Sequence, residues 1–94
     1  MPRYLIEREL PGAGNLSRED LRGISEKWYD ILCTSSPRVQ WVQSFVTGDK
    51  ITSIYIAPDA ESVRQQAERE GLPVNNVLEI AEIIDPITAE KKTH

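Results

Sequence analysis

Apolar and polar positions along the chain follow two periods, one typical of β-strands and one typical of α-helices. A two-residue alternation covers residues 4–9 and ends before Pro11 and two nearby glycines. Ser17 and Asp20 then have the spacing of a helix capping box. Apolar residues follow at helical spacing, as far as the helix-breaking stretch 35–37: Leu21, Ile24, Trp28, Ile31 and Leu32. The first third of the chain is therefore predicted to be a strand followed by a helix.

The middle of the chain has the composition of a β-hairpin. Residues 39–47 and 51–57 are rich in β-branched and aromatic side chains. The pair Gly48-Asp49 between them favours a two-residue turn with positive φ angles. These two strands are therefore expected to pair antiparallel.

A second helix and a last strand follow. Asp59 is placed to cap the helix, and Gly71 stands where a left-handed C-terminal residue belongs. The apolar side of this helix is narrow and consists of Ala60, Val63 and Ala67. Residues 77–85 are predicted to form the last strand, which Pro86 ends.

The order of elements is thus β-α-β-β-α-β, which is typical of the ferredoxin-like α+β fold. Such a fold has a four-stranded antiparallel sheet with both helices on one face. A chain of 94 residues supports a single core, so residues 1–94 are expected to form one domain. The charged end of the chain, from about residue 87, is expected to be frayed.

Strict alternation predicts which side chains the helices leave uncovered. The helix side is expected to hold Tyr4, Ile6, Val42, Val46, Ile54 and Ile56. The open side is expected to hold Leu5, Glu7, Glu9, Trp41, Gln43, Phe45, Ser53 and Tyr55. Its apolar members form a patch too large for a monomer to expose, so a homodimer is predicted. The last strand allows two registers, and either Glu79 or Glu82 faces the open side.

Polar groups within this apolar surface form a candidate binding site. Glu7, Trp41, Gln43 and Tyr55 are predicted to line a ligand pocket, in which Glu7 as base and Tyr55 as acid would act on a small molecule. A structural alternative has equal standing: Glu7 and Gln43 hydrogen-bond across the dimer contact and no ligand is present. A third possibility is a purely structural interaction module.

The charge balance and the cysteine content exclude several classes of function. With 15 acidic and 11 basic residues and a sequence pI near 4.9, the chain is not expected to bind nucleic acid. The charged segment 1–10 lacks the apolar run of a signal peptide, and no stretch resembles a membrane span. A single cysteine, Cys33, forms no internal disulfide. A soluble cytoplasmic protein is therefore expected.

The residues needed for common catalytic centres are missing. His94 is the only histidine and the last residue, so neither a serine nor a cysteine nucleophile has a histidine base. Residues 11–15 contain two glycines but lack the spacing of a phosphate-binding loop. No catalytic residue is assigned, and an enzyme is less favoured than a binding protein.

Five stretches occur in an order that resembles a known family: IERELPGAG, VQWVQSFVTGDKI, YIAPD, VRQQA and IDPITAE. They are similar to a family of small bacterial nickel-binding, nickel-responsive proteins that are mostly labelled as a domain of unknown function. The resemblance runs from residue 3 to 90. It implies a ferredoxin-like fold, a homodimer and binding of Ni²⁺ or another divalent cation.

Two positions depart from that family. Its members often carry histidine where this chain has Gln43 and Gln66, and imidazole suits nickel far better than an amide oxygen does. The carboxylates of Glu7 and Glu9 remain as metal ligands, with weaker and less selective binding expected.

Overall fold

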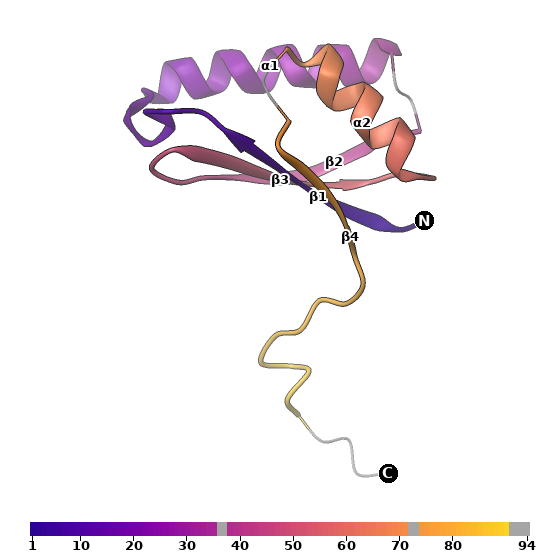
Figure 1. Ribbon diagram of the computed structural model, residues 1–94. Coiled ribbons are helices and arrows are strands. Elements are labelled where there is room, and N and C mark those ends of the chain that lie inside the picture. The colour runs from indigo at the N-terminus through magenta and orange to yellow at the C-terminus, as the bar shows by residue number, and fades with distance from the viewer. Residues whose placement is uncertain (36–37, 72–73, 91–94) are drawn as a thin grey trace.

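The computed structural model describes residues 1–35, 38–71 and 74–90. Its elements are β1 (Arg3–Glu9), the 3₁₀ helix η1 (Ala13–Asn15), α1 (Arg18–Ser35), β2 (Gln40–Val46), β3 (Lys50–Ile56), α2 (Ala60–Arg69) and β4 (Asn76–Ile80). The strands form one sheet in the order β2-β3-β1-β4, with every pair antiparallel. Both helices lie on the same face of the sheet (Figure 1). The predicted ferredoxin-like fold is confirmed.

Local sequence signals set where both helices begin. In the predicted capping box before α1, the Ser17 backbone N–H donates to Asp20 Oδ2 at 3.2 Å, and the Asp20 N–H donates to Ser17 Oγ at 3.0 Å. At the start of α2, Asp59 Oδ1 accepts the Ser62 N–H at 2.8 Å, which lowers the pKa of Asp59. Gly71 follows α2 with a φ of 82°, as a left-handed helix end requires.

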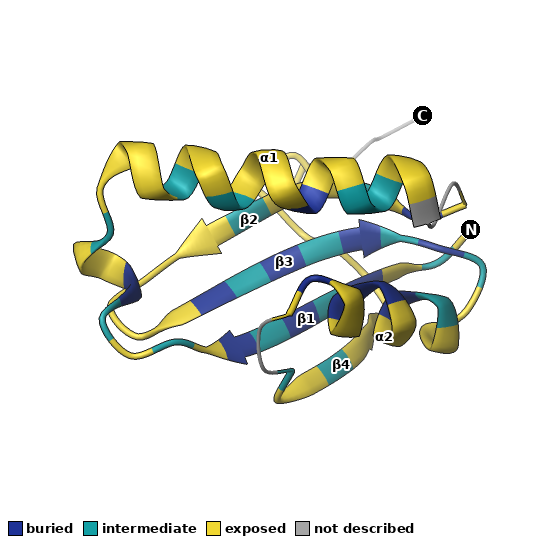
Figure 2. Ribbon diagram, turned by 90° about the horizontal axis from the view of Figure 1, so that it is seen from above, coloured by how far each residue is buried: buried dark blue, intermediate teal, exposed yellow. Residues whose placement is uncertain are grey.

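The core lies between the helices and the sheet. Buried and half-buried residues alternate along β1 and β3 (Figure 2). One buried cluster packs beneath α2 and contains Tyr4, Ile6, Val39, Tyr55, Ala57, Val63 and Ala67. A second contains Ala13, Trp28 and Ile51 and lies against α1. The apolar stripe predicted for α1 is confirmed, since its five residues are all buried or half-buried.

A β-bulge corrects the predicted faces of β2. The pairing with β3 shifts between Trp41 and Gln43, so Trp41 is opposite Tyr55 whereas Gln43 is opposite Ile54. The bulged position carries Val42, which was expected on the helix side and is 46% exposed. One extra residue reverses the alternation after it. Trp41 and Gln43 therefore lie on opposite faces, and Trp41 lies under the helices.

The phase of β3 is also the reverse of the prediction. Ser53 and Tyr55 are fully buried on the helix side, while Ile54 and Ile56 are half-buried on the other face. The strand has isoleucines in both phases, at 51, 54 and 56, so its own pattern does not distinguish the faces. The pairing with β1 distinguishes them, because Tyr4 and Tyr55 are direct partners.

The β2–β3 turn forms without the expected positive φ angles, since among the described residues only Gly12 and Gly71 have them. Tertiary contacts to the loop after β1 hold the turn instead. The Gly14 N–H donates to the Gly48 carbonyl at 2.9 Å, and the Gly12 N–H donates to Asp49 Oδ1 at 3.0 Å. A Cβ atom on Gly14 would lie 3.1 Å from Gly48 Cα and from the Thr47 carbonyl oxygen, so this close approach of two backbones favours glycine.

The last strand is shorter than predicted. β4 ends at Ile80, which pairs with Arg3, the first residue of β1. Beyond this point β4 has no neighbouring strand to pair with, so the chain leaves the sheet. Residues 81–90, which we call the arm, extend away from the body (Figure 1). Fraying from residue 87 stays a prediction, and residues 91–94, with His94, lie outside the described part.

Candidate functional site: the open face of the sheet

The face of the sheet opposite the helices is uncovered, and we call it the open face. The register of the four strands arranges its side chains in rows across β2, β3, β1 and β4. The first two rows contain Gln40, Ile56, Arg3 and Ile80, then Gln43, Ile54, Leu5 and Leu78. The next rows contain Phe45, Thr52, Glu7 and Asn76, then Lys50 and Glu9.

The open face has an apolar half and a polar half. Five of its six aliphatic and aromatic residues belong to the first two rows, and Leu78 among them is 52% exposed. The other two rows carry the two glutamates, with Phe45, 49% exposed, as their one large apolar residue. A contiguous apolar strip of this kind on the surface of a small protein is typical of an interaction site. The arm begins directly after Ile80, which lies within the apolar half.

Glu7 and Glu9 lie two positions apart on β1 and so point to the same side. Glu7 Oε1 accepts a hydrogen bond of 3.1 Å from Asn76 Nδ2. Glu9 is opposite Lys50 in the sheet and lines a shallow surface depression of about 370 Å³ together with Pro11, Asp49 and Lys50. The positive charge of Lys50 offsets part of the negative charge of the two glutamates at this end of the open face.

A second group of functional side chains is buried on the helix side. Arg8 Nη2 donates to Glu70 Oε1, and both side chains are buried, at 0% and 1% exposure. Tyr55 Oη donates to the same carboxylate at 2.8 and 2.9 Å, and Gln66 Nε2 donates to its Oε2 at 3.0 Å. The guanidinium of Arg8 also lies over the Trp28 ring, 4.9 Å from its centroid. This cluster joins β1, β3 and α2.

Burial controls the proton equilibria of the cluster. It raises the pKa of Glu70, while donation from Gln66, the charge of Arg8 and donation from Tyr55 oppose the rise. The pKa of Tyr55 is raised above its ordinary range, first by burial and then by the adjacent Glu70 carboxylate. Tyr55 therefore remains a neutral hydrogen-bond donor, and it is unsuited to giving up a proton in catalysis.

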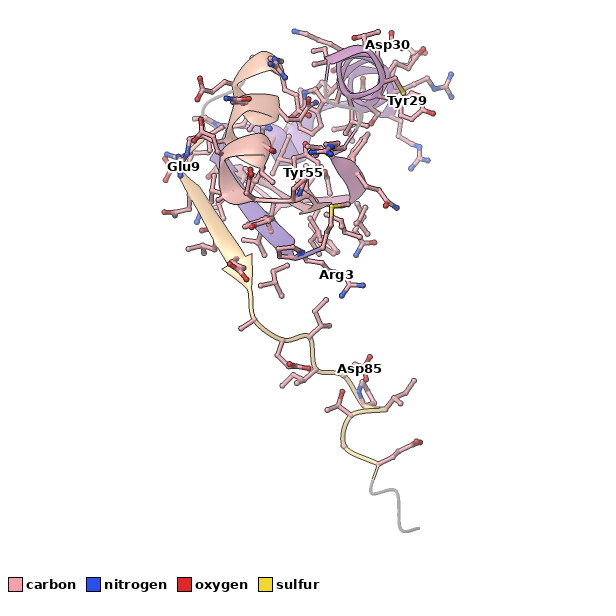
Figure 3. The ribbon with its side chains drawn as sticks, turned by 90° about the vertical axis from the view of Figure 1, so that its right-hand side faces the viewer. Arg3, Glu9, Tyr29, Asp30, Tyr55 and Asp85 are labelled. Atoms are coloured by element: carbon pink, nitrogen blue, oxygen red, sulfur yellow. The ribbon has the colours of Figure 1, made fainter. Side chains whose placement is uncertain are left out.

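The four residues predicted to line one pocket do not share a face. Glu7 and Gln43 lie on the open face, whereas Trp41 and Tyr55 lie under the helices. The hydroxyl of Tyr55 points into the layer between sheet and helices (Figure 3). A direct acid and base pair of Glu7 and Tyr55 is thus wrong, because the sheet separates them.

Sequence reasoning did not assign Arg8, Glu70 and Gln66 to a common cluster. A signal was present, since Arg8 has the same phase in β1 as the buried Tyr4 and Ile6. Gln66 in α2 and Glu70, the residue that follows α2, continue the spacing of Val63 and Ala67 along the buried side. Ala60, predicted for that side, is exposed. Polar residues in phase with a core indicate a buried network when opposite charges occur on two elements.

The described residues of one copy do not form a fitting nickel centre. Within residues 1–35, 38–71 and 74–90, no three His, Cys, Asp or Glu side chains gather in a metal-binding arrangement. Gln66 is buried on the helix side, where its Nε2 donates to Glu70, and Gln43 lies on the other face of the sheet, so the two amides do not meet. The free thiol of Cys33 is exposed on α1. The carboxylate donors on the open face are those of Glu7 and Glu9, and such oxygens suit harder, weakly held cations.

The fold and its uncovered face define a small ferredoxin-like α+β protein whose sheet is covered by helices on one side alone. The chain belongs to the SCO4226-like family of nickel-responsive proteins, whose family model matches residues 4–80. The resemblance seen in the sequence is thereby confirmed over this range, which ends where β4 ends.

A solved structure has the same fold. The crystal structure of SCO4226 from Streptomyces coelicolor A3(2) superposes with a TM-score of 0.72 at 15% sequence identity, over 87% of this chain and 99% of that one. At this identity the likeness concerns the fold. No curated protein matches the chain. In the part of the chain that the structure describes, no helix has the length and apolar character needed to cross a membrane.

Proposed function

We propose that this chain is a homodimeric binding protein of the nickel-responsive type that self-associates through the open face. The exposure of Phe45 and Leu78, 49% and 52%, on the face that also carries Leu5 and Ile54 is the observation behind this proposal. A second copy presents the same apolar strip, so a two-fold contact would remove both strips from water. The opposite charges of Arg3 and the two glutamates lie at different ends of the strip and favour one orientation of the two copies.

Sedimentation over a range of protein concentrations tests this dimer. Leu78→Ser should shift the chain toward monomer, because it removes an exposed apolar contact without disturbing the buried core. Tyr29→Ser is the matched control, since Tyr29 is 60% exposed on α1, away from the open face. A chain that sediments as a monomer of 10.7 kDa at every concentration contradicts the proposal.

We further propose that the dimer binds a divalent cation where the two copies meet. It is supported by the membership of a nickel-responsive family and by the two carboxylates of Glu7 and Glu9 on one face. The described residues of one copy supply too few donors, so the ion would need glutamates from two copies. Oxygen ligands give weak binding with little preference for nickel over other divalent metals.

Isothermal titration of metal-free protein with nickel, cobalt and zinc tests the cation. All variants should carry His94→Ala, so that a terminal imidazole does not supply a nickel site of its own. In that background, replacing Glu7 and Glu9 by Gln should abolish the heat of binding, while Glu61→Gln on the exposed side of α2 should leave it unchanged. Heat equal to the mixing blank at millimolar metal contradicts cation binding.

A small-molecule pocket or a cofactor-free enzyme has less support. The pair of residues proposed to act as base and acid is divided between the two faces of the sheet, and the Tyr55 hydroxyl is bound to Glu70. A structural interaction module without any ligand is the outcome if the dimer forms and the titrations are blank.

A further inference from the structure

The arm carries large apolar side chains in an exposed, extended position. After Ile80 the chain leaves the sheet, and three isoleucines of the arm are more than half exposed: Ile83 at 52%, Ile84 at 76% and Ile87 at 68%. Solvated tails are normally poor in β-branched apolar residues, because such residues have nothing to pack against. Figures 1 and 3 show the arm, with Asp85, directed away from the helices and sheet.

The arm has local structure that fixes how these side chains are presented. Asp85 Oδ1 accepts hydrogen bonds from the backbone N–H and the hydroxyl of Thr88 at 3.1 and 3.2 Å. The Asp85 N–H donates in return to Thr88 Oγ1 at 3.1 Å, and the Thr88 N–H also reaches the Asp85 carbonyl at 2.9 Å. Pro86, as the second residue of this turn, restricts φ to the value the turn needs. The turn is therefore specified by its sequence and carries Ile87 within it.

The point where the arm begins determines what it can reach. Ile80 belongs to the row that also contains Arg3 and Ile56, in the apolar half of the open face. When two copies meet through their apolar halves, each arm leaves its own subunit at the contact and extends toward the other subunit. The described arm carries three acidic residues, Glu82, Asp85 and Glu90, and no basic one, whereas the apolar half carries the cation Arg3. The arm and the apolar half of the open face are therefore both apolar and carry opposite charges.

We propose that the arm crosses to the second copy and packs Ile84 and Ile87 against the apolar half of that copy's open face. The inference rests on the proposed homodimer and makes each subunit contribute to covering the other. Reciprocal arms of this kind remove from water both the isoleucines and the strip left around the contact. The surface that the arm's isoleucines contact thus belongs to a second copy of this chain.

The test measures the dimer and the arm separately. In sedimentation, Ile84→Ser with Ile87→Ser should raise the dimer dissociation constant roughly a hundredfold, as expected for two isoleucines withdrawn from an apolar contact. The matched control, Ala81→Ser with Ala89→Ser, changes the same number of arm residues. It should move the constant by about twofold at most, since neither substitution removes a charge or a large apolar side chain.

Isotope-filtered nuclear Overhauser spectra of a mixed sample supply the second measurement. One half of the chains carries labelled isoleucine methyl groups and the other half is unlabelled, so contacts between subunits are selected. Contacts from Ile84 or Ile87 to Leu5 or Leu78 of another subunit support the proposal. Contacts found only within one chain overturn it.

The outcomes distinguish the arm from the dimer. If the wild type dimerises and the double isoleucine variant dimerises equally well, with no methyl contacts between subunits, the arm proposal is wrong and the open-face dimer stands. If the wild type is a monomer at every concentration, the dimer itself is wrong and the arm has no second copy to bind.

Discussion

Arg8 and Glu70 form a fully buried ion pair between positions 62 residues apart in the chain. The pair joins the end of β1 to the residue that closes α2, so it ties the second helix to the sheet. Two further donors, Tyr55 and Gln66, complete the shell of the carboxylate. Buried charges are tolerated when they are paired and hydrogen-bonded in this way.

Removing the positive charge should destabilise the protein strongly. Arg8→Met leaves the Glu70 carboxylate buried without its cation, and we expect a loss of about 3–5 kcal/mol in the free energy of unfolding. Urea denaturation followed by circular dichroism, at one protein concentration, measures it. Arg64→Met on the exposed side of α2 is the control and should change stability by about 0.5 kcal/mol or less. Equal effects of the two substitutions would show that the ion pair adds nothing.

Tyr55 should make stability fall at alkaline pH. Its pKa is raised in the folded state, so this contribution is fully present below the ordinary value of 10.0 and is lost as the pH rises above it. Tyr55→Phe lacks the hydrogen bonds to Glu70 and should be less stable by roughly 1.5–3 kcal/mol near pH 7. Above pH 10 the difference should shrink by about 1.4 kcal/mol per pH unit. Parallel stability curves for the two proteins between pH 8 and 11 contradict this role.

Trp41 should stabilise the subunit and not the dimer contact. Its indole packs edge-on against Trp28, with ring centroids 5.8 Å apart, and its Nε1 donates to Ser44 Oγ at 2.9 Å. Trp41→Ala should lower the free energy of unfolding by about 3 kcal/mol, the low end for a large-to-small change because the ring is only half-buried. Sedimentation in native buffer should be unchanged. If the variant loses the dimer but keeps its free energy of unfolding, Trp41 contributes to the dimer contact and this prediction is wrong.

Two glycines should respond to alanine in opposite directions. Gly23 is exposed within α1, and a Cβ atom there meets nothing within 4 Å, so Gly23→Ala should stabilise by roughly 0.5–1 kcal/mol. Gly71 has a φ of 82°, a conformation that alanine adopts at a cost of about 1–2 kcal/mol. Thermal unfolding of both variants beside the wild type measures the two changes. Stabilisation by Gly71→Ala would mean that the end of α2 does not depend on this left-handed residue.

Local signals predicted most of the fold correctly. Caps at Ser17 and Asp59, the left-handed glycine after α2 and the alternation of β1 depend on residues close together in the chain. The candidate site was predicted only in part. Glu7, Glu9 and Gln43 do belong to the open face, because their positions follow from the phase of β1 and from the second half of β2.

The sequence by itself determined the order of the elements, the ends of the helices and an apolar surface in excess of what one core can bury. Tertiary structure alone decided the faces of Trp41 and Tyr55. A strand that is apolar in both phases, or that carries a bulge, takes its orientation from its partners across the sheet. The tertiary structure also decided that Arg8 pairs with Glu70, because contacts between distant residues form only when the elements that carry them pack together.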